Sequence, residues 1–210
     1  MPAALTPERK AADREALLDA VEDLVYANGV RAVGMDRIRE LSGLSLKQIY
    51  ALFPTKEDLV VAMLRRRDRR WLGELTAHVE QVEDPTARIL AVFDWLGDFF
   101  AAPGFRGCAW INIHGELGSE SEAVLNEVRA HKNAFRAAIT TWADAARTDH
   151  AEAIYLLAEG AMVTAGITGD PEVADRAKAV AERLLTDTEP APVRATPKLS
   201  DSRIRQVSGA

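Results

Sequence analysis

The stretch Met35–Lys56, MDRIRELSGLSLKQIYALFPTK, contains two short helical patterns separated by a turn. Met35, Ile38 and Leu41 recur at helical spacing, which predicts a first helix with one apolar face. Gly43 supplies the permissive backbone that a sharp turn between two helices needs. We therefore expect a helix, a tight turn and a second helix within this stretch.

The second helix of the pair has a start signal of its own. Ser45 occupies the N-cap position and Gln48 follows three residues later, which is the spacing of a capping box. Ile49 and Phe53 should face the interior. The side chains left for an outside partner are Lys47, Gln48, Tyr50 and Ala51. A helix with a buried back and a small polar front, braced by a first helix, has the geometry that enters a DNA major groove.

The sequence around this motif resembles the tetracycline-repressor (TetR) family of regulators. Residues 45–59, SLKQIYALFPTKEDL, combine a Ser-capped recognition helix, a Tyr, a Phe-Pro break and a Thr-Lys-Glu helix start. Residues 16–40, ALLDAVEDLVYANGVRAVGMDRIRE, match the family's first helix and its Asn-Gly stop. The resemblance covers about Glu15 to Leu64. Leu46 and Lys47 stand where the family often has a polar and a small residue, and Arg39 replaces a common Ala. The resemblance implies a DNA-binding head on a larger helical body.

Helix signals continue through the rest of the chain. Thr6-Pro7, Asp84-Pro85 and Asp170-Pro171 each place a capping residue before a proline, and Thr55 starts a long helix that should run past Trp71. The stretch 105–117 is expected to be a short, mostly apolar helix. Sustained strand-like alternation is missing from the sequence. We predict an all-α fold of about nine helices, with an N-terminal three-helix helix-turn-helix head and a C-terminal helical ligand-binding and dimerisation domain.

Composition sets the expected domain limits. We predict a helix-turn-helix DNA-binding domain over residues 1–54, a ligand-binding and dimerisation domain over 55–186, and a disordered tail over 187–210, which is rich in Pro, Ser, Thr and charge. The sequence has neither an apolar run long enough to cross a bilayer nor a cationic-apolar leader with a cleavage site. We therefore expect a cytoplasmic protein.

Charge is distributed unevenly along the chain. The net charge is −6, yet residues 31–70 contain 10 Lys and Arg against 5 Asp and Glu. A basic N-terminal region on an otherwise acidic chain is typical of a protein that binds DNA at one end. The run Arg65–Arg70 is interpreted as a solvated helix face, with DNA contact as the alternative.

The candidate DNA contacts divide into contacts to the DNA phosphates and contacts to the base edges. The Tyr50 hydroxyl and the Lys56 ammonium can donate to phosphate, and the resemblance implies this role for both positions; the alternative is that Tyr50 packs between helices. Lys47 and Gln48 are predicted to reach base edges, with phosphate as an equal alternative for Lys47. Leu46 and Ala51 could offer an apolar contact to a thymine methyl. The complete predicted set is Ser45, Leu46, Lys47, Gln48, Tyr50, Ala51 and Lys56.

Aromatic residues concentrate in the C-terminal part, where the resemblance implies an effector pocket. A ligand pocket needs mostly apolar walls and a few orienting polar groups, so we predict a small, largely apolar effector. Trp110 and His114, four residues apart, could line one wall together. The alternative is an ordinary aromatic core. The predicted pocket residues are Trp95, Phe99, Phe105, Trp110, His114 and Trp142.

Cys108 is the only cysteine, so an intrachain disulfide is impossible. We interpret it as a small buried hydrophobe rather than a redox or electrophile sensor, because its neighbours are apolar and only Arg106 could lower its pKa. The Cys and His spacings do not indicate a metal site. We expect neither a cofactor nor a metal.

Two late segments suggest an interface between copies of the chain. The predicted helices over 149–166 and 171–185 are rich in small and apolar residues and should form a two-fold symmetric dimer interface, with core burial as the alternative. We therefore predict a homodimeric, ligand-responsive regulator, a repressor that a small effector releases from a palindromic DNA operator. The rivals are an activator of the same fold and a helical protein-binding adaptor. An enzyme is disfavoured because neither a nucleophile-base pattern nor a phosphate loop is present.

Overall fold

The computed structural model describes residues 6–186, which form nine α-helices and no strand. The all-α prediction is confirmed. The helices are α1 (Pro7–Asn28), α2 (Met35–Ser42), α3 (Leu46–Leu52), α4 (Lys56–Val79), α5 (Pro85–Ala101), α6 (Ala109–Leu117), α7 (Glu122–Ala145), α8 (Ala151–Thr168) and α9 (Val173–Thr186). The predicted tail over 187–210 lies outside the described residues.

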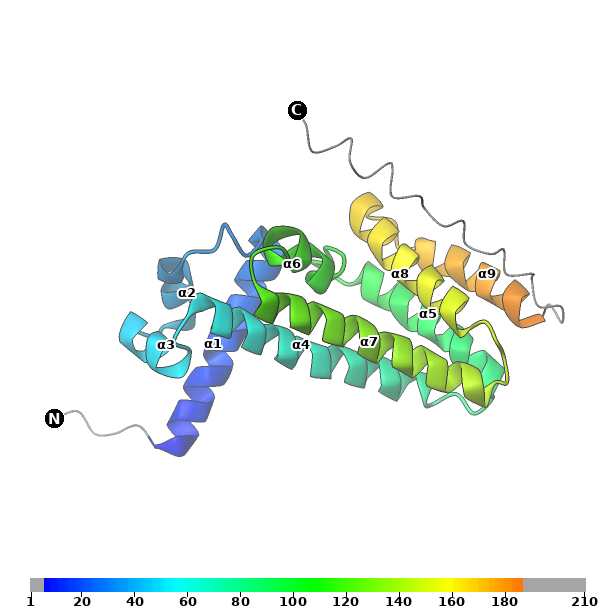
Figure 1. The fold of residues 1–210 in the computed structure, drawn as a ribbon, viewed down its shortest axis with the longest axis horizontal. Helices are drawn as coiled ribbons and strands as arrows, with labels where there is room; N and C mark the ends of the chain where they lie inside the picture. The colour runs from blue at the N-terminus through cyan, green and yellow to red at the C-terminus, as the bar shows by residue number, and fades with distance from the viewer. Residues whose placement is uncertain (1–5, 187–210) are drawn as a thin grey trace, which may run out of the picture.

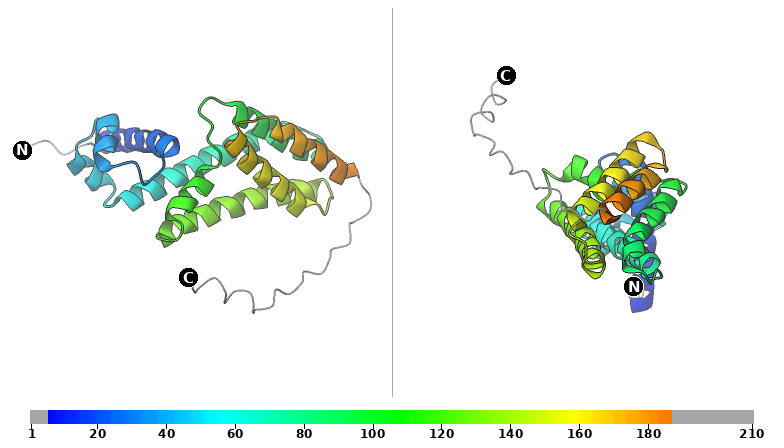
Figure 2. Two further views of the ribbon diagram at one scale, coloured as in Figure 1. Left: turned by 90° about the horizontal axis from the view of Figure 1, so that it is seen from above. Right: turned by 90° about the vertical axis from the view of Figure 1, so that its right-hand side faces the viewer.

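The helices separate into a head and a body. Helices α1, α2 and α3 lie at one end of the molecule, and α4 runs from this head along α7 into the body (Figure 1). At the other end α9 packs against α5 and α8 (Figure 2). Helix α4 is thus the predicted long connector between the two regions. Among the described residues, no helix combines the length and apolar character needed to span a membrane.

Local capping signals set most helix starts. The Thr6 side chain accepts a hydrogen bond from Arg9 N, and the Asp84 side chain accepts one from Ala87 N. The expected start at Asp170-Pro171 is wrong by two residues, since α9 begins at Val173. There Asp170 Oδ1 accepts from Glu172 N at 3.0 Å and so closes a turn instead of capping the helix.

The helix expected over 105–117 begins four residues late, at Ala109. Gly104 and Gly107 both adopt positive φ angles, of 82° and 78°, which break the helical path. Tyr26 of α1 holds this loop, because its hydroxyl donates to Gly107 O at 2.8 Å and accepts from Arg106 N at 2.9 Å. A contact from a distant helix therefore determines where α6 starts.

The head core forms where α1 meets the two short helices. Leu17, Leu18, Ile38 and Ile49 are all fully buried, each contributing about 1.5–3 kcal/mol by burial. Leu41, predicted to share the buried face of α2, is instead 54% exposed. Three residues advance an α-helix by about 300°, so Leu41 is displaced by roughly 60° around the helix from Ile38. The contact with α1 is too narrow to cover it.

Candidate nucleic-acid interface

Helices α2 and α3 are joined by the predicted tight turn. Gly43 adopts φ 69°, in the left-handed region, and its N–H donates to Arg39 O at 3.1 Å, which closes α2. Ser45 then starts α3 with an extended backbone. This pair of helices is the helix-turn-helix unit expected from the sequence.

The capping box of α3 is formed. Ser45 Oγ accepts from Gln48 N at 3.3 Å, and Gln48 Oε1 accepts from the Ser45 N–H at 3.0 Å and from its hydroxyl at 2.7 Å. The box confirms the predicted helix start, but it engages the Gln48 carbonyl oxygen. A bidentate adenine contact needs that oxygen as an acceptor. Gln48 therefore keeps only its amide N–H donors for a base unless the box opens.

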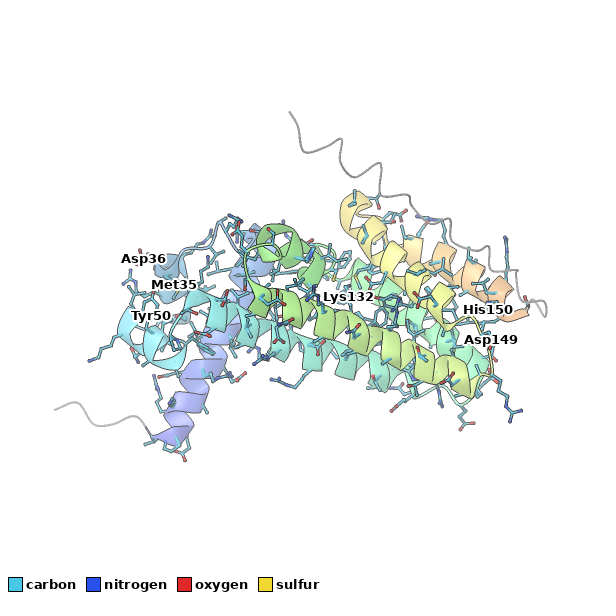
Figure 3. All side chains as sticks on the ribbon, viewed as in Figure 1. Met35, Asp36, Tyr50, Lys132, Asp149 and His150 are labelled. Atoms are coloured by element: carbon cyan, nitrogen blue, oxygen red, sulfur yellow. The ribbon has the colours of Figure 1, made fainter. Side chains whose placement is uncertain are left out.

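The outer face of α3 is directed away from the body. Ile49 and Phe53 are buried, as predicted, while Lys47, Tyr50 and Ala51 are exposed. Tyr50 is 44% exposed and extends from the outer end of the head, which contradicts the alternative of packing between helices (Figure 3).

Leu46 differs from its neighbours on α3, since it is half-buried and packs against the core. Most of its side chain is therefore unavailable to a thymine methyl. Ala51 keeps its exposed methyl group for such a contact.

The Lys56 side chain does not point toward the expected phosphate position. Its Nζ donates to Val30 O, in the loop between α1 and α2, at 2.6 Å. Burial lowers the pKa of Lys56, and the charge of Glu116 partly opposes this effect. The sequence prediction that the Lys56 ammonium contacts phosphate is therefore corrected, because the structure directs this group to Val30 O. What remains at this position is the start of α4, where the N–H groups of Lys56 and Glu57 have no acceptor within the helix.

Sequence reasoning missed Arg37 as a candidate contact. It is exposed in the first turn of α2. Like Lys47, it has no ion-pair partner within residues 6–186. The first turn of a helix favours acidic residues, so a basic residue there was the available signal.

The basic run on α4 is only in part the solvated helix face that the sequence predicted, because several of its arginines pair with neighbouring helices. Arg66 and Arg67 donate to opposite oxygens of Glu22 on α1, at 3.0 and 2.6 Å, and Arg70 also pairs with Glu22. Burial raises the pKa of Glu22, but these guanidinium groups outweigh it and lower the pKa below its usual value. Arg65 pairs with Glu127 of α7 at 2.6 Å. The run therefore joins α4 to α1 and α7 through Arg65, Arg66, Arg67 and Arg70, while Arg65, Arg69 and Arg70 remain exposed.

A second set of polar contacts joins the head to α6. The Glu116 carboxylate accepts from Val30 N at 3.0 Å and from Arg31 N at 2.8 Å, and the Arg31 side chain donates to Glu116 O. We name this set the Glu116 clasp. It attaches the loop between α1 and α2 to the body, next to the start of α4.

The structure brings four of the six predicted pocket residues into one aromatic region. Trp95 stacks on Phe99 with centroids 5.1 Å apart, and Phe99 meets Phe105 at 5.4 Å. Trp71 of α4 packs edge-on against Trp95 at 5.0 Å and against Phe99 at 6.3 Å. Trp110 joins the same region, because it lines a small cavity together with Trp71 and Phe99.

His114 and Trp142 lie apart from this region. His114 is exposed whereas Trp110 is only 2% exposed, so the two side chains do not line one wall. Trp142 is buried on α7 and makes no ring contact with the other aromatics of the described chain. Helical spacing placed Trp110 and His114 on one helix, but the neighbouring helices cover only the first of them.

Two internal cavities lie along α4. One, of about 50 Å³, lies between the head and α6 and is lined by residues that include Tyr26, Met63, Arg67, Ile113 and Glu116. The other, of about 10 Å³, is lined by residues that include Trp71, Phe99, Cys108, Trp110, His131 and Met162. Ligand pockets usually exceed about 300 Å³. An effector that enters the cavity among Trp71, Phe99 and Trp110 would therefore have to move the surrounding helices, whereas Phe105 also borders an open cleft of about 670 Å³.

Comparison with known sequences identifies the head. Residues 17–63 match the family described as bacterial regulatory proteins, tetR family. An uncharacterized HTH-type transcriptional regulator of Mycobacterium tuberculosis is 34% identical over 80 residues, which cover 38% of this chain. The match spans 39% of the length of that curated relative.

Comparison with solved structures extends the likeness to the body. A TetR-family transcriptional regulator from Streptomyces coelicolor superposes with a TM-score of 0.76 at 29% identity, covering 87% of this chain and 96% of that one. A TetR transcriptional regulator from Chloroflexus aurantiacus, at 19% identity and a TM-score of 0.74, covers 86% of this chain and 97% of that one and shares the fold. Both proteins are named as transcriptional regulators. The head of this chain, residues 17–63, is that of the tetR family of bacterial regulatory proteins, and the fold of the described residues is that of a TetR-family transcriptional regulator with an N-terminal helix-turn-helix.

Proposed function

We propose that this regulator is a homodimeric repressor that binds a palindromic operator in the cytoplasm and leaves it when a small, largely apolar effector binds. The observation that carries the proposal is the outer face of α3, which is capped, braced by α2 and exposes Lys47 and Tyr50. Such a helix fits a DNA major groove.

The DNA contacts are assigned by what each exposed group can donate. The Tyr50 hydroxyl and the N–H groups at the start of α4 would hold phosphates, while Lys47 would reach a guanine edge or a phosphate. Arg37, exposed on α2, adds a further phosphate contact. Ser45 and Ala51 lie at the same surface, where a small side chain lets the helix approach the groove.

Dimerisation is assigned to α8 and α9, because exposed apolar side chains gather there. Leu156, Val163 and Ile167 of α8 and Val180 of α9 are between 38% and 81% exposed. The other large exposed hydrophobic residues of the described chain, Leu41 and Tyr50, belong to the head. Contiguous exposed apolar side chains mark interaction surfaces, and two copies of α8 and α9 would bury them in a two-fold interface.

A charge on this surface tests the dimer. Ile167→Glu should convert the protein to a monomer in light scattering and should weaken operator binding, since one short helix rarely provides enough affinity. Ala137→Glu adds the same charge to an exposed site on α7 and serves as the matched control. A dimer that persists in Ile167→Glu would contradict this interface.

Release by an effector requires a ligand that binds the DNA-incompetent state more tightly. The aromatic region meets α4 at Trp71, and α4 begins next to the Glu116 clasp. A ligand that separates Trp71 from Trp95 and Phe99 would move α4 and so change the spacing of the two heads. With half-sites one helical turn apart, the two α3 helices must lie roughly 34–36 Å apart.

Selection of bound fragments from the host genome tests the DNA-binding proposal as a whole. The expected result is enrichment of a short inverted repeat near the regulator's target genes. Enrichment should disappear for Tyr50→Ala with helicity unchanged. A pool without any enriched repeat would contradict the proposal.

A further inference from the structure

Cys108 lies in a polar environment that the sequence did not reveal. It is 6% exposed and precedes the first residue of α6. Lys132 lies on α7 (Figure 3). Its Nζ is 3.4 Å from the Cys108 sulfur and 2.7 Å from Glu159 Oε2 of α8. The expectation that only Arg106 could influence this thiol is therefore wrong, because the fold brings α7 against the start of α6.

His131 supplies the second polar neighbour. Its Nδ1 lies 2.7 Å from Asp68 Oδ1 of α4, and its ring stacks on Trp110 with centroids 3.5 Å apart. A carboxylate that orients an imidazole next to a thiol is the arrangement that activates cysteine nucleophiles. Burial raises the pKa of the Cys108 thiol, but the hydrogen bond of His131 and the charge of Lys132 outweigh it and lower the pKa.

A cavity of about 10 Å³ adjoins this thiol. That volume is close to the space one water molecule needs. Two residues that line the cavity, Trp110 and Arg67, are more than nine-tenths buried. Trp110 Nε1 and Arg67 Nε are N–H donors with no hydrogen-bond partner within the described part of the chain. Buried donors are nearly always paired, so these two indicate a bound water molecule or a ligand of similar size with oxygen acceptors.

We propose that Cys108 is a peroxide-reactive thiol and that hydrogen peroxide is the molecule that enters this cavity. Hydrogen peroxide is uncharged and has only two heavy atoms, and each of its oxygens can accept a hydrogen bond from one of the two donors. The cavity, which is the size of one water molecule, would have to widen slightly to admit it. A bulkier electrophile would have to separate the stacked rings of Trp110 and His131 before it could reach the sulfur.

The reaction balances with the groups in place. The Cys108 thiolate attacks one peroxide oxygen, so that an S–O bond forms as the O–O bond breaks. The departing hydroxide takes a proton from the Lys132 ammonium and leaves as water, and Lys132 recovers a proton from solvent. The sulfur is oxidised to a sulfenic acid and the peroxide is reduced.

Oxidation at Cys108 would affect the head through two contacts. The neighbouring Gly107 O accepts from Tyr26 of α1, and Arg67, which lines the cavity, pairs with Glu22 of α1. The loop has little room to move toward α8, because a Cβ on Gly166 would lie 2.7 Å from Gly107 Cα. An added oxygen should therefore displace the loop toward α1. This consequence rests on the proposed DNA-binding function, whereas the chemistry at Cys108 does not.

The chemical step is tested with the full reduced chain, hydrogen peroxide and a cyclic 1,3-diketone that traps sulfenic acids. The expected result is one trapped adduct, located at Cys108 by mass spectrometry and absent from Cys108→Ser. Lys132→Met should slow trapping on the order of tenfold, because loss of the ammonium raises the pKa of the Cys108 thiol and so reduces its thiolate fraction. Lys178→Met, which removes the ion pair with Asp94 elsewhere, should react like the parent protein.

Three results would overturn the proposal. The parent protein could give no adduct, which is decisive whether or not the variants fold. A maleimide could label Cys108 while peroxide leaves it unmodified, which would assign the site to larger electrophiles. Lys132→Met, with its helicity retained, could react as fast as Lys178→Met.

DNA binding is measured on the same oxidised samples. Operator affinity should fall roughly tenfold or more when Cys108 is oxidised and should stay unchanged in Cys108→Ser under peroxide. If the fully oxidised protein binds DNA as the reduced protein does, the coupling to the head is wrong. If the reduced protein itself binds no DNA, the proposed function fails while the trapped adduct still supports the peroxide site.

Discussion

The two basic segments of the molecule, the outer face of α3 and the Arg65–Arg70 run of α4, use their charge in opposite ways. The run carries five arginines, but those at 65, 66, 67 and 70 pair with carboxylates of α1 and α7. Helix α3 has one basic residue, Lys47, which is exposed and has no ion-pair partner in the described range. A DNA-binding surface is therefore located by which charges lack internal partners and not by how many charges a segment contains.

The largest effect should come from removing the carboxylate that the run depends on. Glu22→Gln would leave the buried Arg67 without a charge partner, whereas Arg66 would keep Asp19 and Glu15. The substitution should lower the free energy of unfolding by about 3 kcal/mol, and the lost contact of the half-exposed Arg70 should contribute little to this loss. Urea unfolding measures this. Glu40→Gln, whose contact to Arg39 is 3.9 Å and exposed, should change stability by less than about 0.5 kcal/mol.

The same carboxylate predicts a pH effect. The pKa of Glu22 is lowered from 4.5 in the folded state, so its contribution to stability is complete above pH 4.5 and is lost as the pH falls through the lower folded pKa. Acid should therefore destabilise the parent protein more steeply than Glu22→Gln. If the free energy of unfolding fell equally with pH below 4.5 in the parent protein and in Glu22→Gln, the proposed role of Glu22 as the partner of the α4 arginines would be contradicted.

The salt dependence of DNA binding separates the two segments. Lys47→Gln should reduce the slope of log affinity against log salt by about 1 for each phosphate that the protein no longer neutralises, whereas Arg65→Gln should leave the slope unchanged. Both side chains are exposed, so the comparison is matched. If the salt dependence of DNA affinity were weaker in Arg65→Gln than in Lys47→Gln, the DNA surface would be assigned to the α4 run instead of α3.

A smaller effect is expected at Arg37. Arg37→Gln should weaken operator binding a few-fold at low salt and leave base preference unaltered, because a phosphate contact carries no sequence information. The measurement is a binding titration against the operator and a scrambled duplex. A change in preference between the two duplexes would show that Arg37 reads bases.

The features predicted from sequence are those encoded within a few residues. The turn at Gly43, the box between Ser45 and Gln48, and the start at Asp84-Pro85 all follow from local backbone preference and short-range hydrogen bonds. Their partners lie within four residues, so the sequence alone identifies them.

The features that sequence missed depend on distant partners. Lys56 is drawn to Val30 O, the arginine run to Glu22, and Cys108 to Lys132, each across more than twenty residues of chain. The sequence shows which contacts a side chain is able to make. Which of several possible partners it actually contacts depends on how the helices pack. The split of the predicted pocket, with Trp110 buried and His114 exposed, has the same cause.

Operator affinity of Tyr50→Ala, compared with the parent protein under one salt condition and with helicity verified, tests most directly whether α3 faces DNA. Tyr50 is exposed and lies outside the buried core, so the substitution should leave the fold intact. We predict a loss on the order of tenfold or more, from one phosphate contact in each half-site. Affinity equal to that of the parent protein would contradict the assignment of α3 as the DNA-reading helix.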